Sequence, residues 1–289
     1  MSAPDERMTP ARVPERRPAL GARLSRMALP VYTGLAVIYL FLPIAVMIAF
    51  SFNDPRGRQN ITWQGFTIDN YFDVWNRTDI TGPMANSLIV AVLATIVATI
   101  LGTLIGLALT RYEFRGRGPL SLLIYVPMAT PEVILGASLL SLWVSFGIQR
   151  GLETIIIAHI MFNISFVVVT VRARIAGFNR SLEEAAMDLG ADELTTFRKV
   201  TLPLIFPGIM AAALLAFALS IDDYVITSFV AGQTTTFPLW VFGASRFGVP
   251  PEVNVLGTLI FVVAFGFILA QILYARRRQV SERVASRVA

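Results

Sequence analysis

The chain has 289 residues, of which 55% are hydrophobic and only 15% are charged. A soluble domain carries roughly 25% charged residues, so this composition excludes an ordinary water-soluble core and predicts a lipid environment. The net charge is +5, but the basic residues lie between apolar runs, which argues against nucleic-acid binding. The absence of cysteine and the presence of a single histidine, His159, leave no disulfide, thiolate or histidine metal site. We expect His159 to be a packed polar residue within a helix.

The apolar runs predict an all-α integral membrane protein. Residues 1–28 hold six arginines and four prolines without apolar periodicity, which predicts a disordered basic tail. The apolar stretch that follows lacks an A-x-A site, so we interpret it as a membrane span rather than a signal peptide. A bilayer core requires about 20 apolar residues. On that basis the transmembrane domain, residues 29–275, has six spans, and a short tail, 276–289, follows it. The predicted spans are 29–51, 84–110, 119–146, 152–171, 205–230 and 253–275.

The distribution of basic residues predicts the orientation. Nineteen of the 24 Lys and Arg residues lie in the two tails, the turn 111–118 and the loop 172–204. Because cytoplasmic segments carry the excess of basic residues, both termini are expected in the cytoplasm. The segment 52–83 then lies outside, with its aromatic side chains at the membrane interface.

The longest predicted cytoplasmic loop, 172–204, has a helical pattern. Ser181 followed by Glu184 is typical of a capping box at a helix start, and Gly190 is suited to a helix end. A second short helix follows, which we expect to end at Pro203. The sequence therefore predicts two short helices around a glycine turn at the membrane surface.

The same loop resembles the EAA loop of ABC importer permeases. The matching residues are Glu184, Ala185, Ala186, Gly190 and Val200-x-Leu202-Pro203, with Val200 where the family pattern has Ile. The resemblance implies the six-helix type I permease fold and a coupling helix whose first four matching residues contact a cytoplasmic ATPase.

The chain is not expected to be an enzyme. It has no G-x-x-x-x-G-K-[ST] sequence, and its only lysine, Lys199, follows no glycine-rich turn. ATP hydrolysis is therefore expected on a separate ATPase subunit that binds ATP and Mg²⁺, with no cofactor held by this chain.

Glu132, Asp222 and Asp223 are carboxylates that fall well inside the predicted spans. An ionised carboxylate at the bilayer centre is costly, so it usually faces a cavity or a partner. Two prolines just before Glu132 should kink or break that helix. These acids are candidates for the substrate pathway; the alternative is a place near the outer interface or a contact with a neighbouring subunit. Tyr224 offers a cation–π surface for an ammonium, or is simply packed.

Three longer segments narrow the resemblance. Residues 127–136, 220–227 and 249–254 are similar to the second permease of spermidine/putrescine importers. That family implies polyamine import across the bacterial inner membrane, with a second related permease, a dimeric cytoplasmic ATPase and a periplasmic or lipid-anchored binding protein. Permeases for ferric iron, thiamine, phosphonates and opines share the loop and remain alternatives. An ion-coupled carrier would usually show an internal repeat, which we do not find. An intramembrane hydrolase would need catalytic partner residues that this sequence does not show.

Overall fold

The computed structural model describes residues 20–57, 59–177 and 179–288. It divides the chain into two compact units. One contains α1 (Leu20–Ser51) and the part of α12 (Pro251–Val288) from Gly257 onward, and the other is Phe52–Leu256. Within the described ranges the regular structure is helical, apart from an isolated antiparallel bridge between Asn53 and Phe66. The all-α prediction is therefore confirmed.

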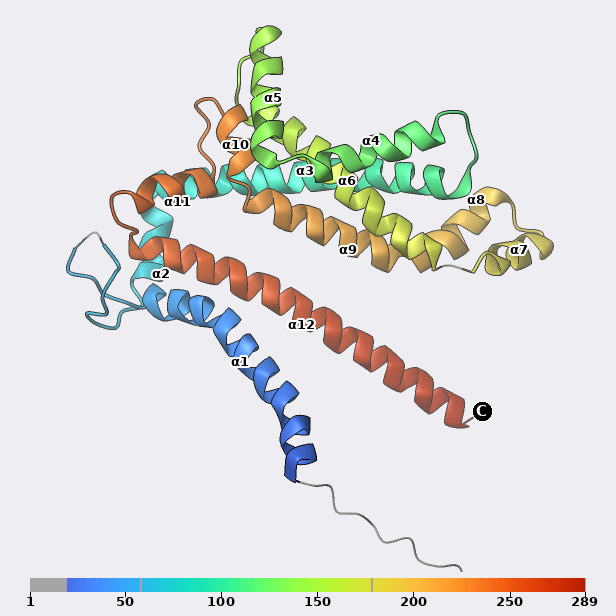
Figure 1. Cartoon of the computed structure of the whole chain (residues 1–289), viewed down its shortest axis with the longest axis horizontal. Helices are drawn as coiled ribbons and strands as arrows, with labels where there is room; N and C mark the ends of the chain where they lie inside the picture. The colour runs from blue at the N-terminus through green and yellow to red at the C-terminus, as the bar shows by residue number, and fades with distance from the viewer. Residues whose placement is uncertain (1–19, 58, 178, 289) are drawn as a thin grey trace, which may run out of the picture. The chain divides into compact units, whose positions relative to one another are not determined.

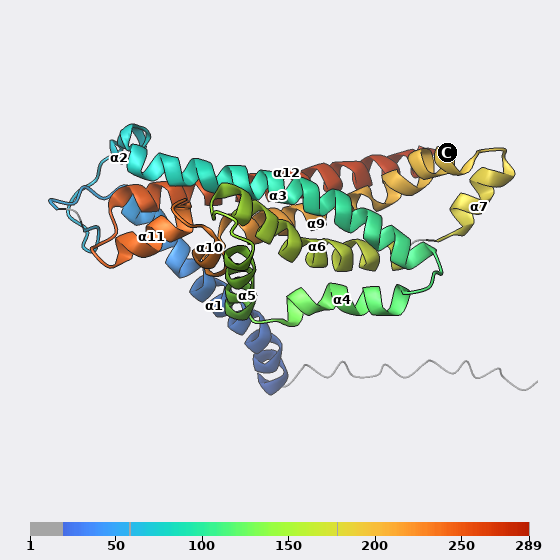
Figure 2. The ribbon, with the colours of Figure 1, turned by 90° about the horizontal axis from the view of Figure 1, so that it is seen from above.

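The larger unit is built around three long helices (Figures 1 and 2). Helix α6 packs against both α3 and α9, and α3 also contacts α9. Shorter helices are attached to these three. The helices of this unit are α2 (Asn70–Asp73), α3 (Thr78–Arg111), α4 (Arg117–Ala129), α5 (Glu132–Ser145), α6 (Leu152–Ala176), α7 (Ser181–Asp188), α8 (Glu193–Thr196), α9 (Leu202–Ile221), α10 (Val225–Val230) and α11 (Phe237–Ser245), with a 3₁₀ turn at Val74–Asn76 and a π-helical turn at Phe197–Thr201.

Small residues allow the three long helices to approach closely. A Cβ atom added at Gly102 of α3 would lie 2.6 Å from the Cγ1 atom of Val167 in α6, and one added at Gly208 of α9 would lie 2.5 Å from the Cγ atom of Arg174 in α6. Ala212 and Ala216 of α9 are fully buried in the same core. Since lipid provides no hydrophobic force between helices, close packing at small residues holds such a bundle together.

The structure supports a protein that crosses the membrane several times. In the described part of the chain four helices are long and apolar enough to span a bilayer: Ala28–Ser51, Thr78–Arg111, Leu152–Ala176 and Glu193–Ile221. Helices α4 and α5 qualify as a fifth span only when taken together, and Pro251–Gly266 is a shorter apolar helix. The count of six spans therefore stays a prediction.

Two predicted spans differ from the structure. The predicted span 119–146 is broken, since α4 and α5 meet at 106° (Figure 2). The break lies at Thr130 and Pro131, as the two prolines indicated. The predicted helix 205–230 is also interrupted: α9 ends at Ile221 and α10 begins at Val225. Asp222 and Asp223 lie in this interruption rather than within a helix.

The first and last helices extend beyond the predicted boundaries of the membrane domain. Helix α1 begins at Leu20, inside the segment predicted as a disordered tail, and residues 1–19 lie outside the described residues. At the other end α12 continues to Val288, through the predicted tail 276–289.

Candidate functional sites

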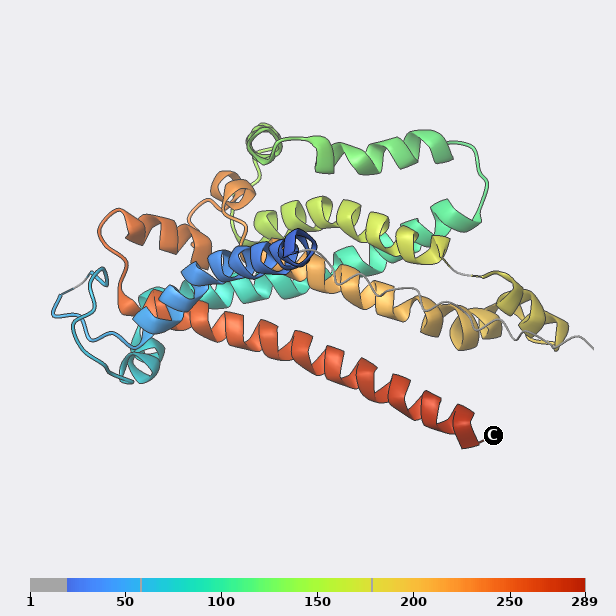
Figure 3. The same cartoon turned by 60° about the horizontal axis from the view of Figure 1, so that its bottom comes forward.

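The loop between α6 and α9 forms the two short helices that its sequence predicted. Helix α7 ends just before Gly190, which has a φ of +86°, and α8 follows. Figure 3 shows α7 (olive) beyond the ends of α6 and α9. The predicted capping box is absent: the Ser181 amide donates instead to the side chain of Asn179. Asp192 caps α8, because its side chain accepts a hydrogen bond from the Thr195 amide.

Pro203 does not end a helix, contrary to the prediction. It lies in the first turn of α9, where the missing amide hydrogen of a proline costs little. The π-helical turn Phe197–Thr201 joins α8 to α9, so the chain runs helically from Glu193 to Ile221.

One face of α7 is exposed and carries the residues of the EAA resemblance. Glu184, Ala185 and Gly190 are exposed, and Ala186 is half-buried. Apolar side chains accompany them: Leu182, Met187 and Leu189 are all exposed, and Leu189 retains 90% of its accessible surface. Exposed leucine and methionine side chains beside acidic residues form a surface suited to protein contact.

Helix α7 also carries a buried residue, Glu183, which sequence reasoning missed. Its carboxylate accepts a hydrogen bond from Arg111 Nη2 at 2.5 Å and another from the hydroxyl of Thr201. Burial alone would raise the pKa of Glu183. The hydrogen bonds from Arg111 and Thr201 and the charges of Arg111 and Arg180 outweigh that effect and hold the pKa below its ordinary value. The ion pair is therefore fully formed at neutral pH and is lost only as the pH falls through this lowered pKa.

The two adjacent aspartates between α9 and α10 have different environments. Asp223 Oδ2 accepts hydrogen bonds from the Thr227 amide at 2.8 Å and the Thr227 hydroxyl at 2.6 Å. The carboxylate thus satisfies the first turn of α10, as an acidic residue at a helix N-terminus does. Asp222 is exposed.

A buried polar network connects Asp223 to α6. His159 Nδ1 lies 2.9 Å from Ser220 Oγ, and Nε2 lies 3.0 Å from Thr227 Oγ1. Asn163 donates to the same Ser220 oxygen at 3.1 Å. Because Ser220 then donates to Nδ1 and Thr227 donates to Asp223, the geometry fits an imidazole with its proton on Nε2. His159 is a packed polar residue, as expected.

The remaining pathway candidates are not brought into this network. Glu132 is exposed at the start of α5. Tyr224 packs on Phe242, with ring centroids 4.4 Å apart. The cation that lies over an aromatic ring here is Arg246, 5.0 Å from the centre of Phe242. The contact between Tyr224 and Phe242 supports the alternative that Tyr224 is simply packed.

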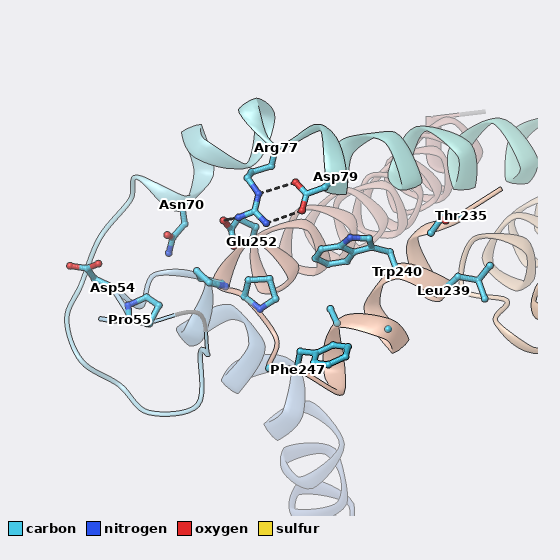
Figure 4. Close-up of a pocket in the computed structure, with 16 residues that line it drawn as sticks. Asp54, Pro55, Asn70, Arg77, Asp79, Thr235, Leu239, Trp240, Phe247 and Glu252 are labelled. Carbon is cyan, nitrogen blue, oxygen red and sulfur yellow. Dashed lines mark hydrogen bonds and ion pairs between the residues drawn. The ribbon is translucent and has the colours of Figure 1, made fainter. Parts of the chain in front are cut away.

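A cavity of about 970 Å³ lies among the 54–57 loop, the start of α3, α11 and the start of α12 (Figure 4). Arg77 donates to both carboxylate oxygens of Asp79 at 2.9 Å and to Glu252 at 2.7 Å. Trp240 and Phe247 line the same cavity. The charged residues that line the cavity are Arg77 and the acids Asp54, Asp79 and Glu252, so the lining carries an excess of negative charge.

The family assignment follows from a sequence match. Residues 98–281 match the model of the binding-protein-dependent transport system inner membrane component. This chain belongs to that family. The matched segment includes α7, α8, α9 and both aspartates, so the exposed loop and the interrupted helix are parts of a permease of an ABC importer. The chain is a transport subunit and not an enzyme, and it acts with an ATPase and a binding protein.

Individual relatives have more specific names. The chain is 41% identical over 239 residues to the spermidine/putrescine transport system permease protein PotC of Escherichia coli (strain K12), covering 82% of this chain and 90% of the relative. It is 38% identical over 244 residues to the putrescine transport system permease protein PotI of the same organism, covering 81% and 86%.

Solved structures share the fold. A chain of a bacterial ABC transporter involved in the import of alginate has a TM-score of 0.62 at 18% identity, with 89% of this chain and 97% of that chain covered. A chain of the MetNI methionine ABC transporter has a TM-score of 0.57 at 19% identity, covering 68% and 95%. The expectation of an ABC importer permease fold is confirmed.

The different environments of the two aspartates lead to a prediction about stability. Asp223→Asn weakens charge-assisted hydrogen bonds to Thr227 and His159, so it should lower the free energy of unfolding by about 1–3 kcal/mol. Asp222→Asn, at an exposed side chain, should change it by less than about 0.5 kcal/mol. Thermal unfolding of the purified chain in detergent measures both. Equal shifts for the two variants would contradict the assignment of Asp223 as the structural carboxylate.

Proposed function

We propose that this chain is the permease through which an ATP-driven importer moves polyamines, spermidine or putrescine, across the bacterial inner membrane. The observation that carries the substrate is the identity of 41% to a spermidine/putrescine permease over most of both chains. The relative named for putrescine alone, at 38%, supports the same chemical class.

The interruption between α9 and α10 gives this proposal a chemical basis. Asp222 is exposed, whereas Asp223 is occupied by Thr227 and His159. A carboxylate in a partly desolvated pathway attracts an ammonium group far more strongly than it does in water. Of the two adjacent acids, Asp222 is therefore the one that would meet a passing polyammonium chain, with Glu132 as a further acid along the route.

The proposal includes the partners and the orientation. The chain would pair with a second related permease and a dimeric cytoplasmic ATPase that binds ATP and Mg²⁺, and would receive substrate from a periplasmic or lipid-anchored binding protein. The exposed face of α7, with Glu184, Ala185, Ala186 and Gly190, would dock on the ATPase. The excess of basic residues in the tails, the turn 111–118 and the loop 172–204 supports cytoplasmic termini.

Uptake of labelled putrescine or spermidine by cells carrying the complete transporter tests the substrate. Asp222→Asn should lower uptake severalfold, equivalent to about 1 kcal/mol of lost transition-state stabilisation, because it removes the charge and keeps the side-chain size. Asp73→Asn, at an exposed acid of α2, is the matched control and should have no effect. Membrane levels of each variant are measured alongside.

Two results would change the proposal in different ways. Unaltered uptake by Asp222→Asn would remove Asp222 from the pathway. Saturable uptake of ferric iron, thiamine, a phosphonate or an opine by the unmodified transporter, with no uptake of polyamine, would leave the importer family in place and exclude the polyamine substrate.

The orientation can be tested with a reporter enzyme that is active only in the periplasm. Fused after Arg278, it should show no activity, because the C-terminus is proposed to be cytoplasmic. A fusion within the 52–69 segment serves as the positive control. Strong activity after Arg278 would reverse the orientation.

Docking of α7 can be tested at Gly190. A Cβ at this position meets no atom within 4 Å, so Gly190→Val should act through backbone strain alone, about 1–2 kcal/mol at a positive φ. We expect less ATPase subunit to co-purify with the variant permease. Gly116→Val is the matched control. Gly116 has a φ of +93°, and a Cβ there also meets no atom within 4 Å, but it lies in the turn 111–118 rather than in the loop 172–204. Normal co-purification with Gly190→Val would contradict docking through α7.

A further inference from the structure

The residue of α7 that faces the protein, Glu183, joins three separate segments. Glu183 is 8% exposed, although Leu182 before it and Glu184 after it are exposed. Its Oε1 atom accepts hydrogen bonds from both Arg111, the last residue of α3, and Thr201, the last residue of the π-helical turn before α9. One carboxylate oxygen therefore connects α7 to an end of each of two long helices.

Helix α7 has few other connections to the helical core. It contacts the π-helical turn and α8, and its C-terminal end passes into the glycine turn at Gly190. Arg111 is itself largely buried, with 22% of its side chain exposed, and Thr201 is fully buried. A buried charge pair holds its geometry more strictly than exposed contacts do, because separating it leaves a charge without a partner away from water.

The π-helical turn gives this contact a second feature. Wide turns of this kind are rare and are frequently found at functional sites. Here the turn spans Phe197–Thr201 and places the Thr201 hydroxyl on Glu183, at the point where the loop becomes α9. The π-helical turn and the ion pair with Arg111 therefore share one acceptor, Glu183 Oε1.

We propose that Glu183 is a positioning residue that transmits movement of the docked loop to α3 and α9, through Arg111 and Thr201. The proposal rests on the proposed docking of α7 on the ATPase and assigns a separate step to the buried residue of that helix. Glu184 and Gly190 belong to the docking surface, whereas Glu183 connects that surface to the two helices that pack on α6. Loss of Glu183 should therefore leave docking intact and disconnect ATP hydrolysis from transport.

The test uses the complete transporter in liposomes, with binding protein and labelled polyamine. In Glu183→Gln we expect the ATPase subunit to co-purify normally and ATP hydrolysis to continue, while the number of substrate molecules transported per ATP falls severalfold. The double variant Glu183→Arg with Arg111→Glu restores an ion pair and should recover part of that ratio. Glu113→Gln, at an exposed acid two residues after Arg111, is the matched control and should leave the ratio unchanged.

Other outcomes would overturn the proposal. A proportional fall of transport and ATP hydrolysis, loss of the ATPase subunit, or no effect would each show that Glu183 does not transmit movement. If Glu183→Gln fails to accumulate in membranes, Thr201→Val removes only the hydroxyl donor and must lower the same ratio. The proposed docking is judged separately by Gly190→Val, which should lower co-purification itself. Normal association in Gly190→Val together with a lowered ratio in Glu183→Gln would contradict docking through α7 while still assigning Glu183 to coupling.

Discussion

The close packing of α3, α6 and α9 against one another is the constraint on which the rest of this permease depends. Gly102, Gly208, Ala212 and Ala216 leave no room for larger side chains at these contacts, so the relative positions of the three helices are narrowly defined. Both candidate sites are built on segments that leave this core. The acids follow the C-terminal end of α9, and the α7–α8 loop connects α6 to α9.

Each of these segments is attached to the core by a carboxylate that is not exposed. Asp223 bonds to Thr227 and lies 3.3 Å from His159 of α6. Glu183 bonds to Arg111 and Thr201. In both places the neighbouring acid in the sequence, Asp222 or Glu184, is exposed. A buried acid must be satisfied by donors of the protein, whereas an exposed acid keeps its contact with solvent.

The sites therefore share one arrangement, in which an acid bonded within the protein lies next to an exposed acid in the sequence. At the α9–α10 interruption the structural acid caps α10, and the exposed acid faces the proposed pathway. On α7 the structural acid anchors the helix, and the exposed acid belongs to the proposed docking surface. Removal of charge should consequently have different effects within each pair. At Asp223 or Glu183 it should affect stability or coupling, and at Asp222 or Glu184 it should affect substrate or partner binding.

The sequence by itself determined the membrane environment, the helical class, the glycine turn after α7 and the break before Glu132, because hydropathy, glycine and proline act locally. It could not determine that Pro203 lies in the first turn of α9 or that α9 stops at Ile221, since these depend on the π-helical turn and on the capping of α10 by Asp223. It also gave no means to separate Asp222 from Asp223 or to find Glu183. Arg111 lies 72 residues from Glu183, and His159 lies 61 residues from Ser220. Only the packing of α6 against α3 and α9 brings such groups within hydrogen-bonding distance, and that packing decides which acid of each pair is buried.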